Sequence, residues 1–266
     1  MSLPDYTYLP KIMLAPNGAR RTKADHPALP VTISETVEAA RSAFEAGADG
    51  LHTHVRDEHQ RHCLDAGLYR ELLSELALVV PDMFAQITTE AVGRYSPLEQ
   101  RDLVRAIEPR AVSIGLREMT SEGDTPEVSA FYHEQRDRGV AIQHILYDVA
   151  DVDHLTDACA SGLIPADGLQ LLFVLGRYTT GQQSSPSDLD PFMSSLARLE
   201  EKLEIKADWS CCAFGQGETD CLLRAMALGG KVRIGFENNL FNQDGSLATS
   251  NTERVRDLIR AMEDKP

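Results

Sequence analysis

Short apolar runs alternate with longer amphipathic stretches along the whole chain. The first run, residues 11–15, is stopped by Pro16 and Gly18 and predicts a strand. In residues 64–80, leucines recur at helical spacing (Leu68, Leu72, Leu76) and predict a helix. The other predicted strands cover residues 50–55, 83–88, 111–114, 141–147, 169–174, 208–213 and 231–234.

Polar residues mark where several of the predicted helices begin. Thr32 and Glu35 form a capping-box pattern, and Ser250 with Glu253 repeats it before the last helix. Ser96 is followed by a proline, which suits the first turn of a helix. The remaining predicted helices cover residues 127–138, 151–161, 191–203 and 217–228.

Eight strand–helix units follow one another without a change of composition that would mark a linker. That count, in a chain of 266 residues, predicts a (β/α)8 TIM barrel with one domain over residues 1–266. A doubly wound open sheet is the competing fold. It usually has a glycine-rich phosphate turn after the first strand, and Pro16-Asn17-Gly18-Ala19-Arg20 is not one.

Composition narrows the choice of partners. The net charge of −15 argues against nucleic acid and anionic membranes as partners, although a local arginine cluster still permits an anionic small molecule. No stretch approaches the ~20 apolar residues of a spanning helix. The five cysteines are odd in number and include no Cys-x-x-Cys, which favours reduced thiols and a cytoplasmic location.

His52 and His54 are the first candidate site residues. They lie two apart on a predicted strand, so both side chains point the same way, as the ligands of a zinc-type metal would. A His-x-His pair on its own is more often a polar decoration of a sheet. In a closed barrel, however, the eighth strand lies beside the first, which brings Glu237 to the same mouth. Two histidines and one carboxylate, with positions left open, are typical of a catalytic metal set.

Arginines and hydroxyl groups surround the predicted metal position. Arg20 and Arg21 follow the first strand, and Arg233 lies on the last, which fits a substrate with a carboxylate or phosphate. Any one of these arginines would more often be a solvated surface residue. Thr88 and Ser113, at strand ends, are expected either to bind substrate oxygens or to fill the barrel top.

The other histidines are interpreted as structural residues or left open. For His144, facing the lumen and packing under the helices are equally compatible with the sequence. The histidines expected in loops or on helix surfaces are His26, His59, His62, His133 and His154.

Four segments together resemble the β-keto acid cleavage enzymes, in family order and over nearly the whole chain: His52-Thr53-His54-Val55-Arg56-Asp57, Gly235-Phe236-Glu237-Asn238-Asn239, Pro27-x-x-Pro30-Val31-Thr32 and Phe173-Val174-Leu175-Gly176. The resemblance implies a zinc-dependent TIM barrel that converts a β-keto acid and acetyl-CoA into acetoacetate and an acyl-CoA. It further implies the zinc ligands His52, His54 and Glu237, a catalytic arginine at Arg233, and substrate-holding hydroxyls at Thr88 and Ser113. Homo-oligomers, commonly tetramers, are also implied.

Two departures from the family pattern change the expectation. Asn238 stands where the family has a proton-accepting aspartate, and an amide cannot accept that proton. Glu90 is our first candidate for a replacement base and Glu118 our second. Arg20 replaces a glutamate that would contact an ammonium group, so we expect a substrate with an anionic or polar distal group. Arg117 is unlike the small residues usual at its position and is expected to narrow the pocket.

Two other functions remain compatible with these residues. One is a metal-dependent aldolase or hydrolase on the same barrel, and the other is a catalytically silent ligand-binding relative. The ligand set accepts Mn²⁺ or Co²⁺ as well as Zn²⁺.

Overall fold

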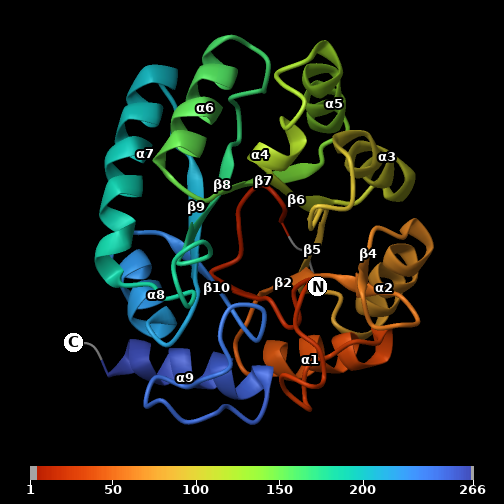
Figure 1. Cartoon of the computed structure of the whole chain (residues 1–266), viewed down its shortest axis with the longest axis vertical. Helices are drawn as coiled ribbons and strands as arrows, with labels where there is room; N and C mark the ends of the chain where they lie inside the picture. Colours follow the sequence, from red (N-terminus) through yellow and green to blue (C-terminus); the bar gives the residue numbers. More distant parts are fainter. Residues whose placement is uncertain (1–4, 265–266) are drawn as a thin grey trace.

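Eight parallel strands close into a barrel, with helices ringed around it (Figure 1). The computed structural model describes residues 5–264. Around the barrel the order is β1-β10-β9-β8-β7-β6-β5-β2, so β1 lies between β2 and β10. This confirms the predicted TIM barrel. The strands are β1 Ile12–Leu14, β2 Gly50–Thr53, β5 Phe84–Thr88, β6 Ala111–Gly115, β7 Ala141–Leu146, β8 Gln170–Leu175, β9 Asp208–Ala213 and β10 Lys231–Ile234.

The long helices begin where the polar signals predicted. Thr32 and Ser96 both form complete capping boxes, and the hydroxyl of Ser250 accepts a hydrogen bond from the N–H of Glu253. These helices are α1 Ile33–Glu45, α2 Ala66–Val79, α3 Pro97–Ile107, α5 Pro126–Asp137, α6 Val149–Ala160, α7 Asp190–Leu203, α8 Glu218–Ala227 and α9 Asn251–Glu263.

A hairpin replaces the end of the strand predicted over residues 50–55. The barrel strand β2 ends at Thr53, and β3 (Val55–Arg56) then pairs antiparallel with β4 (His62–Cys63). The turn between them is held by Asp57, whose carboxylate accepts hydrogen bonds from the N–H groups of His59 and Arg61. Two further short elements were not predicted, α4 (Leu116–Met119) and a 3-10 turn, η1 (Pro186–Leu189).

The main core lies between the strands and the helices, and a second set of side chains fills the lumen. At the amino ends of the strands, Met13, Phe84 and Ala111 form an apolar floor with Leu9, and Tyr6 stacks on Phe84. The next lumen positions along β5, β7 and β9 are polar and buried: Gln86, Gln143 and Ser210.

His144 belongs to the outer shell of the barrel. Its ring packs against Tyr132 of α5, with 5.4 Å between the ring centroids. This settles the question that the sequence left open. Within residues 5–264 no helix combines the length and the apolar character needed to cross a bilayer.

Candidate active site

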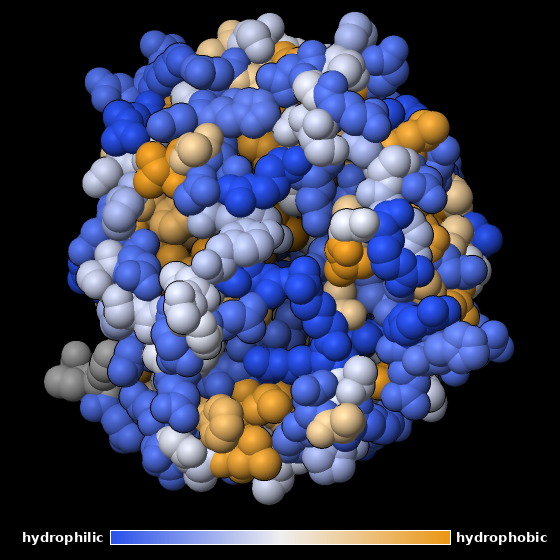
Figure 2. All heavy atoms as spheres, in the orientation of Figure 1, coloured by the Kyte–Doolittle hydropathy of each residue, from blue (hydrophilic) through white to orange (hydrophobic). Residues whose placement is uncertain are grey.

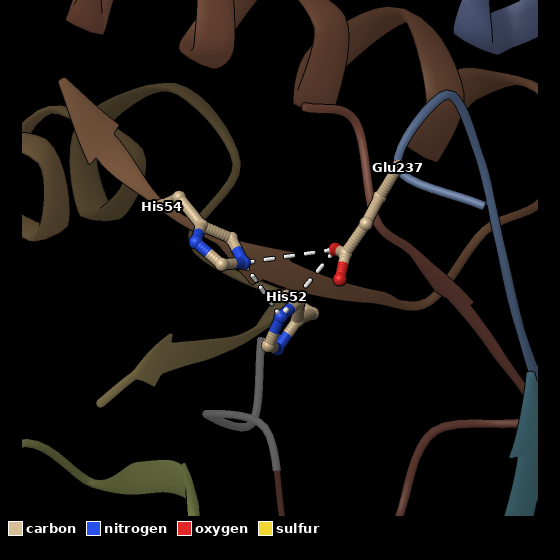
Figure 3. A group of neighbouring side chains, drawn as sticks. All are labelled: His52, His54 and Glu237. Carbon is tan, nitrogen blue, oxygen red and sulfur yellow. Dashed lines mark hydrogen bonds and ion pairs between the residues drawn. The ribbon is translucent and has the colours of Figure 1, made fainter. Parts of the chain in front are cut away.

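His52, His54 and Glu237 converge at the carboxyl ends of the strands (Figure 3). His52 lies on β2, His54 directly follows that strand, and Glu237 comes from the loop after β10. The two Nε2 atoms are 3.2 Å apart. One carboxylate oxygen of Glu237, Oε2, lies 3.5 Å from Nε2 of His52 and 3.7 Å from Nε2 of His54.

These distances fit a bound divalent metal. Ligand atoms about 2.0–2.2 Å from a tetrahedral zinc lie about 3.3–3.6 Å from one another. Oε2 of Glu237 is buried and has no hydrogen-bond donor among the described residues, as expected for an oxygen reserved for a cation. Burial lowers the pKa of His52 to about 4, so at neutral pH the ring is uncharged and has a free lone pair.

Gly18 makes the position of Glu237 possible. Its φ of +62° lies in the left-handed region, and an added Cβ would stand 2.5 Å from Cγ of Glu237. The loop after β1 therefore packs directly against the carboxylate of the candidate metal site, and only glycine fits there.

Arg233 is the buried cation beside this group. Its Nη2 donates to Oε1 of Glu237 (3.2 Å) and to Sγ of Cys212 (3.4 Å), while Nε and Nη1 have no partner among the described residues. Burial alone would raise the pKa of Glu237, but the surrounding positive charges, Arg233 foremost, lower it below the usual value. The carboxylate thus stays ionised, and Arg233 keeps N–H groups free for a ligand.

Two residues of the candidate metal site, His52 and Glu237, line a cavity of about 690 Å³, counting space open to solvent. A hollow surrounded by hydrophilic residues is visible near the middle of the molecule in Figure 2. Of the residues singled out from the sequence, the structure places Arg20, Thr88, Glu90, Glu118, Arg233 and Glu237 around the cavity.

Glu90 is the carboxylate best placed for proton transfer. Its Oε2 lies 3.8 Å from Nε2 of His54, and burial, then the charges of Glu237 and Glu118, raise its pKa to about 7. Glu118 is more constrained, because its carboxylate accepts hydrogen bonds from the N–H of Ala91 and from Gln100. Burial also raises the pKa of Glu118.

Besides His54, three predicted site residues lie outside this cavity. The hydroxyl of Ser113 stands behind the metal ligand, 3.4 Å from Nδ1 of His52. Arg117 does not narrow the cavity, because its guanidinium is drawn away by Asp148 (2.8 Å) and Asp151 (2.7 Å) at the start of α6. The side chain of Asn238 lines a separate surface cavity, and its amide has no partner among the described residues.

The two arginines in the loop after β1, Arg20 and Arg21, differ in their contacts. Arg21 donates to the backbone carbonyls of Phe236 and Asn238 and so fastens the loop that carries Glu237. Arg20 is exposed at the cavity and makes no hydrogen bond or ion pair within residues 5–264.

Arg177, in the loop after β8, was missed by sequence reasoning. Its side chain is only 13% exposed, its guanidinium lies over the ring of Phe214, and its nearest carboxylate oxygen, on Glu90, is 3.9 Å away. The sequence feature that could have identified Arg177 is its position just after a barrel strand, where the catalytic loops of this fold lie.

The expectation that His62 lies in a loop or on a helix surface was wrong. The β3–β4 hairpin folds back over the site and buries the ring, with its Nδ1 3.3 Å from Nδ1 of His54. The Nε2 of His62 lies 2.8 Å from the backbone carbonyl oxygen of Glu90. His62 therefore connects His54, a candidate metal ligand, with the loop that carries Glu90.

Comparisons with known proteins point to one family. The model of the beta-keto acid cleavage enzyme family matches residues 11–265. The 3-keto-5-aminohexanoate cleavage enzyme of Fusobacterium nucleatum is 28% identical, over 91% of this chain and 87% of that protein. The 3-oxoadipate:acetyl-CoA acetyltransferase of Cupriavidus necator is 26% identical, over 95% and 88%.

Solved structures share the fold. ObcA in its binary complex with oxaloacetate superposes with a TM-score of 0.68 at 16% identity. The match covers 88% of this chain but only 63% of that longer one. Because the family model spans nearly the entire sequence, this chain belongs to the beta-keto acid cleavage enzyme family.

Proposed function

We propose that this protein is a zinc-dependent β-keto acid cleavage enzyme that uses acetyl-CoA as co-substrate. The products are acetoacetate and the CoA thioester of the remaining acyl group. One observation carries the proposal: a group of metal-ligand geometry, His52, His54 and Glu237, stands beside the partly unpaired Arg233 in an open cavity. The names of the two relatives, a β-keto acid cleavage enzyme and an acetyl-CoA acetyltransferase, support the reaction class.

The products determine which bonds change. Acetoacetate retains the carboxylate and α-carbon of the β-keto acid and gains the acetyl group of acetyl-CoA. A new bond therefore joins the α-carbon to the acetyl carbon, and the bond from that acetyl carbon to the CoA sulfur breaks. The old bond from the α-carbon to the β-carbonyl carbon also breaks, and the released acyl group ends on the CoA sulfur. When bound, the metal supplies Lewis-acid polarisation of the β-ketone oxygen, which makes the α-proton more acidic.

Residues of this chain supply the remaining steps. Glu90 removes the α-proton and returns a proton to the α-carbon when the bond to the β-carbonyl carbon breaks, roles that the amide of Asn238 cannot fill. The free N–H groups of Arg233 stabilise the negative charge that develops on the substrate. The Thr88 hydroxyl oxygen already accepts the N–H of Glu90 (3.2 Å), which leaves its proton for a substrate oxygen.

We further propose that the substrate has an anionic distal group, such as the second carboxylate of a β-keto diacid. Arg20 and Arg177 both line the cavity. Among the described residues Arg20 has no ion-pair partner, and Arg177 has one long contact, 3.9 Å to Oε1 of Glu90. An arginine pair of this kind favours a carboxylate over an ammonium group. The Cupriavidus necator relative is named for 3-oxoadipate, a diacid of this class.

Turnover with zinc and acetyl-CoA tests both proposals, with acetoacetate as the readout. We expect β-ketoadipate or β-ketoglutarate to be preferred over 3-keto-5-aminohexanoate and over neutral β-keto acids. Preference for the amino-bearing substrate would retain the reaction and refute the anionic group. No acetoacetate from any substrate, with metal bound, would refute the reaction and favour the aldolase or hydrolase alternative.

Two matched variants test whether Arg20 and Arg177 are the residues that select an anionic substrate. Arg20→Glu and Arg177→Gln should each raise KM for the diacids relative to the neutral substrates, because only the diacids lose a distal contact. Any change in kcat caused by the altered charge near Glu90 should be common to both classes of substrate. An equal loss on charged and neutral substrates would show that the arginines support the cavity rather than select the substrate.

A further inference from the structure

Hydrogen-bond chains lead away from both histidines of the metal-binding group, on the side opposite the metal position. Each chain ends on a backbone carbonyl oxygen, which can only accept a hydrogen bond. The direction of every bond in the chain follows from that end, so the proton of each imidazole can be located.

The first chain crosses the lumen from β8 to β2. The Nε2 of Gln143 donates to the carbonyl oxygen of Leu171 (3.3 Å) and to the hydroxyl of Ser210 (2.8 Å). Its Oε1 must then face Gln86, which donates from Nε2 (3.1 Å). This leaves Oε1 of Gln86 towards Nδ1 of His52 (2.9 Å), so that Nδ1 carries the proton.

The second chain is shorter and starts at the loop of Glu90. The carbonyl oxygen of Glu90 accepts from Nε2 of His62 (2.8 Å), so the Nδ1 of His62 has the lone pair. That lone pair faces Nδ1 of His54 at 3.3 Å, which must therefore carry the proton. Both chains thus leave the Nε2 lone pairs of His52 and His54 directed at the metal position.

A competing tautomer of either histidine, protonated on Nε2, would block the metal position. The two Nε2 atoms are 3.2 Å apart, which is close enough for one ring to donate to the other if its proton moved to Nε2. That internal hydrogen bond would occupy both metal-binding atoms. It would also leave a buried acceptor without its donor, on Gln86 or on His62, at a cost in free energy.

We propose that His62 and Gln143 are positioning residues that keep both metal-binding histidines protonated on Nδ1. The inference rests on the proposed metal site, but neither residue lines the catalytic cavity. Gln143 acts on His52 through Gln86, and His62 acts directly on His54. Partners of this kind change metal affinity about 10–100-fold in zinc proteins.

The experiment compares zinc affinity in the full-length wild-type protein and three variants, by competition with a chromogenic chelator. His62→Leu and Gln143→Leu should each weaken zinc binding about 10–100-fold. His62→Gln is the matched control: its amide oxygen can accept from His54 while its amide nitrogen donates to Glu90, so its affinity should stay within a few-fold of the wild type.

Imidazole ¹⁵N chemical shifts of the metal-free proteins give a readout that does not depend on metal or turnover. We expect Nδ1–H for His52 and His54 in the wild type. His62→Leu should shift only His54 towards Nε2–H, and Gln143→Leu only His52. Wild-type rings protonated on Nε2, or unchanged affinity in both Leu variants, would overturn the inference. If the expected shifts are seen but no acetoacetate forms, the inference about His62 and Gln143 stands and only the proposed reaction is refuted.

Discussion

Gly18 shows how one missing side chain shapes the candidate metal centre. We predict that Gly18→Ala weakens zinc binding at least tenfold, because its Cβ would stand 2.5 Å from Cγ of Glu237. Gly139→Ala is the matched control, since Gly139 has a similar φ of +72° but open space around its Cβ position. Titration with zinc measures both. Equal affinities in the two variants would show that Glu237 is not held by this contact.

Substitution of Glu90 gives the most direct test of the proposed mechanism. Glu90→Gln should lower kcat by about 10²–10⁴, because an amide cannot accept the α-proton. Glu118→Gln should cost much less, since Glu118 already accepts bonds from Ala91 and Gln100. Steady-state acetoacetate assays compare the two variants. A Glu90→Gln enzyme with near-normal kcat would remove Glu90 from the mechanism.

Individual site residues were predictable where topology alone determined their place. His52 and Glu237 could be paired because a closed barrel makes β2 and β10 neighbours of β1. Arg177 could not be singled out, since nothing local separates an arginine that enters a cavity from one in solvent. His62 was misplaced because its burial depends on a turn between strands of two residues each.

The first turn of α1 gives a prediction at the scale of an element. Burial alone would raise the pKa of Glu35, but hydrogen bonds from Lys23 and from the N–H groups of Val31 and Thr32 lower it to about 2. A depressed folded-state pKa stabilises the protein above the unfolded value of 4.5, and this contribution is lost as the pH falls towards 2.

Glu35→Gln tests that contribution. We expect it to lower the free energy of unfolding by about 1 kcal/mol at pH 7, because its side chain is 38% exposed and solvent screens its charge. The difference from the wild type should shrink between pH 4.5 and pH 2. Urea unfolding at several pH values measures it, with the exposed Glu122→Gln as control. A pH-independent difference would mean that geometry, not charge, stabilises the cap.

Regular elements were more predictable than the pieces between them. All eight barrel strands were found, because each is a buried run with clear polar boundaries. The β3–β4 hairpin and α4 were missed, since elements of two and four residues are too short to show a period. Those short elements carry His62 and Glu118, so the omission affected the site more than the fold.

At the scale of the whole molecule, the candidate metal site takes its residues from strands on both sides of β1. Zinc held by residues from the β2 and β10 ends should therefore stabilise the closed barrel. We predict that free zinc at 100 times its Kd raises the free energy of unfolding by about 2.7 kcal/mol, and that a chelator reverses this. Thermal unfolding measures it. Glu237→Ala should show a much smaller shift, and a full shift would place the zinc elsewhere.

The assembly of the protein stays a prediction. Family resemblance leads us to expect a homo-oligomer, commonly a tetramer, built from a chain with one domain over residues 1–266. Light scattering on the purified protein, at several concentrations, gives the mass directly. A mass of one chain, 29.3 kDa, at all concentrations would refute the oligomer.

The apolar floor of the lumen has a kinetic consequence. Leu9, Met13 and Phe84 close the amino ends of the strands, while the cavity opens among the loops at their carboxyl ends. Both substrates of the proposed reaction must then enter through the same opening, at the carboxyl ends of the strands. The β-keto acid is the smaller of the two and binds deeper. Bound acetyl-CoA would bar the β-keto acid from entering behind it. Turnover should accordingly follow a compulsory order, with the keto acid first in and acetoacetate last out.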